Sequence, residues 1–71
     1  MKRKFSGSLM RYEREKECGY TLQKLADLMG VNWQSVLRWE SNKVKPNADY
    51  VALIADCLGC DINDLYEIIE Q

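Results

Sequence analysis

Ala26-Asp-Leu-Met-Gly-Val-Asn-Trp-Gln-Ser-Val-Leu-Arg-Trp-Glu40 is the stretch of this 71-residue chain that decides its fold. It combines the end of one helix, a tight turn and the start of a second helix. Leu25 and Met29 are four residues apart and share one helical face. Gly30 can adopt the left-handed conformation that ends a helix, and Asn32 can accept a hydrogen bond from the free N–H groups of the next helix. The stretch therefore predicts a helix-turn-helix unit.

The second helix of this unit, residues 33–41, has an inward and an outward face. Val36 points inward, with Leu37 and Trp39 flanking it, and Trp39 is expected to join the core. The side chains on the outward face are the candidate base readers: Trp33, Gln34, Ser35 and Arg38. The tryptophan in this set either contacts a sugar or a thymine methyl group or covers the edge of the core.

Apolar spacing and capping residues predict three further helices, so the helix-turn-helix consists of the second and third of five. The first helix is expected from residue 6 or 8 to about residue 18, the fourth from residue 47 to about 58, and the fifth from residue 61 onward. No strand-like alternation is present, so the expected fold class is all-α. Residues 1–5 are interpreted as a flexible basic N-terminal arm, which either reaches DNA or solubilises the chain, and residues 6–71 as one domain.

Chain length and charge limit the possible functions. A chain of this length forms one domain, and no apolar run reaches the ~18–20 residues that cross a bilayer. The basic start, Lys2 to Lys4, is not followed by the apolar segment of a secretory signal, so a cytoplasmic protein is expected. The net charge is −1, but all ten Lys and Arg residues precede Pro46 and six of the eleven acidic residues follow it. Such segregation orients a polyanion toward the basic part of the domain.

The three cysteines are Cys18, Cys57 and Cys60, and the chain has no histidine. An odd number of cysteines without an export signal indicates reduced thiols rather than disulfides. Cys57 and Cys60 form a C-x-x-C pair, which is either half of a zinc or redox site or two small apolar residues at a helix end. The second interpretation is favoured because a tetrahedral zinc site would need carboxylates or a second chain here. Neither a metal nor a cofactor is expected.

Several short segments match a pattern known from one family of DNA-binding proteins: Thr21-Leu-Gln-Lys-Leu-Ala26, Gly30-Val-Asn32, Val36-Leu-Arg-Trp-Glu40, Asn42-Lys43, Pro46, Ile54-Ala55 and Leu58-Gly59. Together they resemble the Cro and phage-repressor family, the lambda repressor-like or xenobiotic-response-element-type helix-turn-helix regulators. The resemblance spans about residues 8–66. It implies a compact five-helix domain that binds a double-stranded DNA operator, usually as a dimer, with its third helix in the major groove. The expected function is a transcriptional regulator, and more specifically a repressor, with no small-molecule ligand.

By this resemblance, the four candidate readers occupy the family's base-contacting positions. Gln34 can make two hydrogen bonds to adenine and Arg38 can make two to guanine, and each such contact discriminates by ~1–3 kcal/mol. Further positions correspond to family residues near the phosphates: Thr21, Asn32, Asn42, Lys43 and Lys45.

Two positions depart from the family pattern. Leu22 stands where the family often has a glutamine that contacts phosphate, so that contact is lost and Leu22 is expected to pack. The family also tends to pair the residue equivalent to Glu40 with an arginine of the first helix. Arg14 suits this role only if the first helix contains one extra residue before its end, and otherwise Glu15 would face Glu40. Arg14 is the expected partner and Arg11 the second choice.

The fourth helix has an apolar column off its core face, formed by Tyr50, Leu53 and Cys57. With Ile68 and Ile69 it forms either scattered surface residues or a subunit contact, and the contact is favoured because a monomer would expose an apolar patch. A two-fold dimer would place two reading helices ~34 Å apart and would bind a palindromic operator.

A second class of function remains open. An antitoxin-like or adaptor module would keep the same fold and hold a protein partner on its acidic back face. Leu22 and the net charge favour this alternative, whereas Gln34, Arg38 and the lysines near residue 44 favour DNA. An enzyme is not expected, because the chain has no histidine, no Gly-rich phosphate loop and no nucleophile beside a base.

Overall fold

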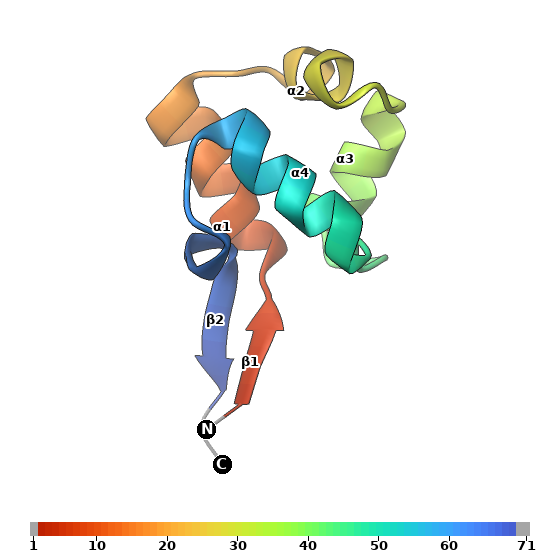
Figure 1. Cartoon of the computed structure of the whole chain (residues 1–71). Coiled ribbons are helices and arrows are strands. Elements are labelled where there is room, and N and C mark those ends of the chain that lie inside the picture. The colour runs from red at the N-terminus through yellow and green to blue at the C-terminus, as the bar shows by residue number, and fades with distance from the viewer. Residues whose placement is uncertain (1, 70–71) are drawn as a thin grey trace.

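The computed structural model describes residues 2–69, which form a helical body with a two-stranded ribbon extending from it (Figure 1). The elements in chain order are β1 (Lys2–Phe5), α1 (Gly7–Tyr12), the π-helical segment η1 (Glu13–Cys18), α2 (Leu22–Met29), α3 (Trp33–Glu40), α4 (Ala48–Leu58), the 3₁₀ segment η2 (Ile62–Leu65) and β2 (Tyr66–Ile69). The helix-turn-helix predicted from the sequence is present as α2 and α3. The ribbon lies at the opposite end of the molecule from α2 (Figure 1).

One hydrophobic core joins the helices to the base of the ribbon. Its buried side chains are Phe5, Met10, Leu25, Ala26, Met29, Val36, Trp39, Val51, Ile54, Ala55, Leu58 and Leu65. The prediction that Trp39 joins the core is confirmed, since 6% of this residue is exposed. The inward faces of α2 and α3 are buried as predicted at Leu25, Met29 and Val36, whereas Leu37, expected beside the core, is exposed.

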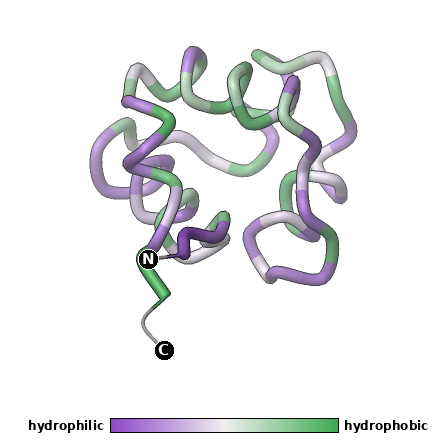
Figure 2. Tube along the Cα trace, turned by 60° about the horizontal axis from the view of Figure 1, so that its bottom comes forward, coloured by the Kyte–Doolittle hydropathy of each residue, from purple (hydrophilic) through white to green (hydrophobic). Residues whose placement is uncertain are grey.

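Hydrophobic and hydrophilic residues alternate at short intervals along the trace (Figure 2). This is the pattern of short amphipathic helices that cover a small core. Among residues 2–69, no helix has the length and apolar character needed to cross a membrane.

The first helix changes its geometry halfway along. Ser6 caps it by accepting a hydrogen bond from the N–H of Leu9 at 3.2 Å, and the following residues form the regular helix α1. The continuation η1 is a π-helix, which is wound more widely than an α-helix and so accommodates one extra residue. This is the extra residue that the sequence required if Arg14 was to face Glu40.

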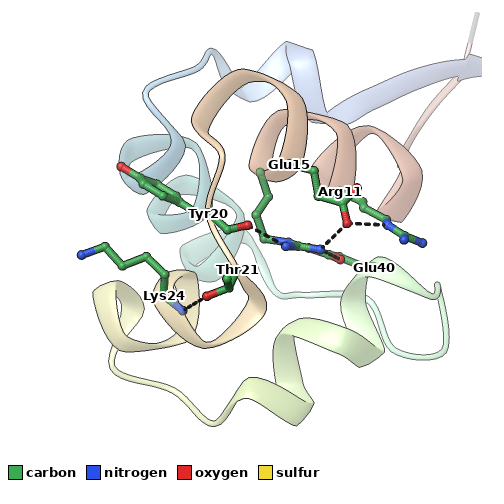
Figure 3. Close-up of polar contacts among 7 residues, drawn as sticks. Arg11, Glu15, Tyr20, Thr21, Lys24 and Glu40 are labelled. Atoms are coloured by element: carbon green, nitrogen blue, oxygen red, sulfur yellow. Dashed lines mark hydrogen bonds and ion pairs between the residues drawn. The ribbon is translucent and has the colours of Figure 1, made fainter.

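Arg14 and Glu40 form a buried ion pair between η1 and α3. Arg14 is 5% exposed, and its Nε and Nη2 atoms donate to the two carboxylate oxygens of Glu40 at 2.6 and 3.0 Å. Its Nη1 atom donates to the carbonyl of Tyr20 at 2.8 Å, which fixes the connection to α2 (Figure 3). The hydrogen bond to Glu40 raises the pKa of the Arg14 guanidinium. Arg11 instead pairs with Glu15 at the surface, at 3.1 Å, and lowers the pKa of the Glu15 carboxyl.

The start of α1 contacts the end of α3 at Gly7. The Gly7 N–H donates to Oδ1 of Asn42 at 3.0 Å. Asn42 can offer this oxygen because it adopts a left-handed conformation with φ of 62°, which asparagine tolerates better than most residues. A Cβ atom on Gly7 would overlap the backbone carbonyl oxygens of Trp39 and Glu40. Only glycine allows this close approach.

The two ends of the described chain differ from the sequence expectation. Residues 2–5, expected as a flexible arm, form β1, and the expected fifth helix consists of the single turn η2 followed by β2. The all-α, five-helix description was therefore wrong at the termini, although the helical body agrees with it. Asp61 and Asp64 do cap η2 reciprocally, as a helix start requires, but pairing with β1 takes over from Tyr66 onward.

The antiparallel pairing of β1 with β2 explains why the basic segment is ordered. Phe5 lies opposite Tyr66 and is buried, with their rings in an edge contact at 6.2 Å between centroids. Lys4 lies opposite Glu67, and their charged atoms are 3.6 Å apart. Burial of the phenylalanine and the strand hydrogen bonds outweigh the conformational entropy of a free arm. Position 1 of the expected arm and positions 70–71 of the expected domain lie outside the described residues.

The buried ion pair predicts unequal effects of two mutations. Glu40→Ala removes the buried carboxylate that pairs with Arg14 and leaves its guanidinium only the exposed Glu15 carboxylate and the Tyr20 carbonyl. This loss should lower the free energy of unfolding by about 3–5 kcal/mol. Arg11→Ala removes only a surface pair and should cost less than about 1 kcal/mol. Urea unfolding followed by tryptophan fluorescence measures both. Similar small losses for the two variants would contradict a structural role for the pair.

Gly7→Ala should destabilise the domain, although alanine is the better helix former. The added methyl group must displace the backbone at the end of α3, at a cost of about 1–3 kcal/mol. Ser8→Ala, one residue further along the same helix and exposed, is the matched control and should stay within about 0.5 kcal/mol of the parent. Thermal unfolding followed by circular dichroism compares them, and a stabilised Gly7→Ala variant would show that α1 and α3 are not in this contact.

Candidate nucleic-acid interface

The turn between α2 and α3 is built by local hydrogen bonds. Gly30 takes the left-handed conformation with φ of 73°, and the next N–H, that of Val31, donates to the carbonyl of Ala26 at 3.0 Å. Asn32 then caps α3, since its Oδ1 accepts from the N–H of Gln34 at 2.8 Å. The roles predicted for Gly30 and Asn32 in forming the turn are confirmed. They fix the direction in which α3 leaves α2.

The structure gathers the four candidate base readers on the outer side of α3. Trp33, Gln34 and Arg38 are exposed and Ser35 is half-buried. Trp33 is 41% exposed, so more than half of its surface is covered by the domain while the rest is available to a ligand. The opposite side of the helix is buried through Val36, Trp39 and Glu40. A helix held on one side only can present the other to a ligand.

Leu37 is a residue of this outer face that the sequence interpretation missed. It was expected to flank the core, but it is 44% exposed. It lies four residues after Trp33 and so shares a helical column with that exposed side chain. This spacing, rather than the hydrophobic character of leucine, was the signal that could have identified it.

The candidate phosphate-contacting residues surround this helix. Thr21 is exposed before α2, where its hydroxyl oxygen accepts from the N–H of Lys24 at 3.0 Å (Figure 3). The side-chain oxygens of Asn32 and Asn42 are also engaged, in the cap of α3 and in the contact with α1 respectively. Lys43 and Lys45 are exposed in the loop after α3. The structure thus leaves the two lysines as charged donors and gives the three polar residues an additional structural role.

A surface hollow of about 410 Å³ lies between the first helix, the start of α2 and the end of α3. Leu22 and Leu37 provide its apolar wall, and Thr21, Ser41 and the residues of the ion pair provide its polar wall. Leu22 is half-buried and packs against the core, as expected from its departure from the family pattern. The hollow is therefore lined by the same element that carries the base readers.

The cysteines lie away from this face and have the character of buried thiols. Cys18 Sγ donates to the carbonyl of Leu58 at 3.1 Å. Burial raises the pKa of the Cys60 thiol to about 11, and burial also raises the pKa of Cys18 and of Cys57. A raised pKa disfavours the thiolate that nucleophilic or metal-binding chemistry requires. Among residues 2–69, no three Cys, Asp or Glu side chains are grouped to hold a metal ion.

The residues expected at a subunit contact are divided between two elements. Tyr50, Leu53 and Cys57 lie on α4, where the Tyr50 ring packs on Trp39 at 5.1 Å between centroids and the other two partly pack against the core. Ile68 and Ile69 lie on β2, in the ribbon. Ile68 is the most accessible residue of this set, at 55% exposed. The ribbon thus offers more free apolar surface than the column on α4.

Comparison with known proteins agrees with this geometry. A family model described as helix-turn-helix, of the Cro/C1 type, matches residues 10–65, which include the whole of α2, the turn and α3. Neither a curated protein nor a solved structure matches the chain. The match covers well over half of the chain and contains every candidate base and phosphate residue. The chain belongs to the Cro/C1-type helix-turn-helix family, whose members are DNA-binding regulators.

Proposed function

We propose that this protein is a sequence-specific regulator of transcription, acting as a repressor, that inserts α3 into the major groove of double-stranded DNA. One observation carries the proposal: the outer face of α3 exposes Gln34 and Arg38 side by side, whereas its acidic residue is buried and paired. A helix with no exposed acid and with amide and guanidinium groups at its surface is compatible with approach to a polyanion.

The two polar side chains have complementary chemistry toward base pairs. The amide of Gln34 matches the acceptor and donor of adenine, and the guanidinium of Arg38 matches the two acceptors of guanine. Ser35 and Trp33 add contacts to base edges or sugars at the front of the helix. Lys43 and Lys45 then supply the phosphate contacts that hold the helix in register. Thr21 and Asn32 contribute at the exposed starts of α2 and α3.

The chain is further proposed to bind as a two-fold dimer on a palindromic operator. Support comes from the apolar side chains that remain exposed outside α3, above all Ile68 in the ribbon. Two copies related by a two-fold axis would place their reading helices in successive major grooves, ~34 Å apart. The ribbon is suited to this contact because its outer strand edges have free backbone groups for pairing.

A protein-interaction module is the alternative function. The observations that favour it are that Leu22 packs against the core and that six of the eleven acidic residues follow Pro46. A fluorescence titration with mixed genomic duplexes at low salt separates the two functions, because phosphate contacts are strongest there. Absence of binding under these conditions would reject the DNA-binding function and leave the alternative.

Two alanine variants should weaken DNA binding in different ways. After selection of bound duplexes from a random pool, Arg38→Ala should relax the preference at one base pair of the selected site, at a cost of about 1–3 kcal/mol. Lys43→Ala should weaken binding to all duplexes alike and reduce the salt dependence of affinity. Titrations of the selected duplex and its point variants at several salt concentrations give both quantities. Equal losses on every sequence for Arg38→Ala would contradict its role as a base reader.

Ile68→Glu should weaken dimerisation without unfolding the monomer. Ile68 lies opposite Arg3 in the ribbon, so a glutamate there gains a cross-strand partner of opposite charge while placing charge at the subunit contact. Tyr12→Ser, which changes an exposed side chain on α1, is the control. Sedimentation with and without the selected duplex should show a dimer for the parent and the control and mostly monomer for Ile68→Glu. Equal dimer content in all three would exclude the ribbon as the contact.

A further inference from the structure

The outer face of α3 carries an apolar column beside its polar readers. Trp33 and Leu37 occupy one column, and Gln34 and Arg38 occupy the adjacent one. The two apolar side chains are 41% and 44% exposed. Leu37 also forms a wall of the surface hollow together with Leu22 of α2, so the apolar surface continues past the helix.

The fold places position 37 on the outer face of α3, but it does not require an apolar residue there. Val36, the preceding residue, lies on the inner face and has no exposed surface. An apolar side chain that is exposed in the free protein contributes a favourable free energy when a ligand buries it. Burial of Leu37 by a ligand on the outer face of α3 would therefore strengthen binding of that ligand.

The charges around the column indicate what that ligand is. Arg38 follows Leu37 directly, and Lys43 and Lys45 are exposed just beyond the helix. The single acid of α3, Glu40, is buried against Arg14. Glu15 also lines the hollow beside Leu37, but its carboxylate is paired with Arg11 and Arg14. The exposed charges of α3 and of the loop after it are therefore positive, which complements a polyanion rather than an acidic or neutral protein surface. The apolar group that double-stranded DNA presents in its major groove is the C5 methyl group of thymine.

We infer that Leu37 is a specificity-determining residue that contacts thymine methyl groups in the major groove, next to the base pairs contacted by Gln34 and Arg38. This inference rests on the proposed function. Trp33 precedes Leu37 by one turn, ~6 Å along the helix, so the two side chains reach different base pairs. Leu37 reads the presence of a methyl group, which hydrogen-bonding side chains do not detect.

The test removes the methyl group and nothing else. Deoxyuridine pairs with adenine as thymine does but lacks the C5 methyl group. A duplex selected by the parent protein is resynthesised with each thymine replaced in turn by deoxyuridine, and the affinities are measured by fluorescence titration. Loss of one buried methyl group should weaken binding about fourfold at one or two positions.

The Leu37→Ala variant assigns the effect to this side chain. It should bind the thymine and uracil duplexes with the same affinity at those positions, and its thermal unfolding should match that of the parent because Leu37 is exposed. Leu28→Ala changes a leucine of similar exposure on α2 and should retain the fourfold difference.

Several outcomes would overturn the inference and are distinguishable. Equal parent affinity for all uracil duplexes, or a fourfold difference that persists in Leu37→Ala, rejects the role of Leu37 while DNA binding by the protein stands. A selected site without thymine has the same consequence. Absence of binding to any duplex at low salt rejects the proposed function and the inference together.

Discussion

The placement of α3, the helix that carries the candidate base readers, depends on the ion pair between Arg14 and Glu40. A domain of this size has a small core, and two charges inside it are tolerated because they pair with each other and because Arg14 also donates to Glu15. The pair is bidentate, and the same guanidinium also holds the Tyr20 carbonyl at the start of the connection to α2. One buried group thus ties three consecutive helices together. Its geometry requires the wider winding of η1, so a local change in helix type determines a long-range contact.

The consequence for α3 is that it is held at both ends and along its inner face. Asn32 caps its first turn, and Asn42 beyond its last turn accepts a hydrogen bond from Gly7. A reading helix must keep its side chains within a fraction of an ångström of the geometry that base pairs require, and fixed ends serve this requirement. Asn32 and Asn42, which we propose to lie near the DNA phosphates, therefore also have a structural role in the free protein.

The features that could be predicted from the sequence are those that depend on residues close together in the chain. Gly30, Asn32 and the apolar spacing of α2 to α4 identify the helix-turn-helix because caps, turns and helical periodicity involve neighbours in the chain. The ribbon was not predictable in this way, since Lys2–Phe5 pairs with Tyr66–Ile69 at the other end of the chain and four-residue runs fit a helical or an extended period equally well. Leu37 was missed because its residue type suggested burial, whereas its column with Trp33 places it outside.

The apolar column of Trp33 and Leu37 on α3 would add a contribution to DNA binding that differs in kind from that of the charged residues. The proposed phosphate contacts of Lys43 and Lys45 would weaken with salt and act alike on all duplexes. The proposed contact of Leu37 with a methyl group would depend little on salt and would act only where thymine is present. A protein with a net charge of −1 has limited electrostatic attraction to DNA in general. For such a protein, apolar and bidentate contacts on α3 raise the ratio of specific to non-specific binding more effectively than additional positive charge, which would strengthen both.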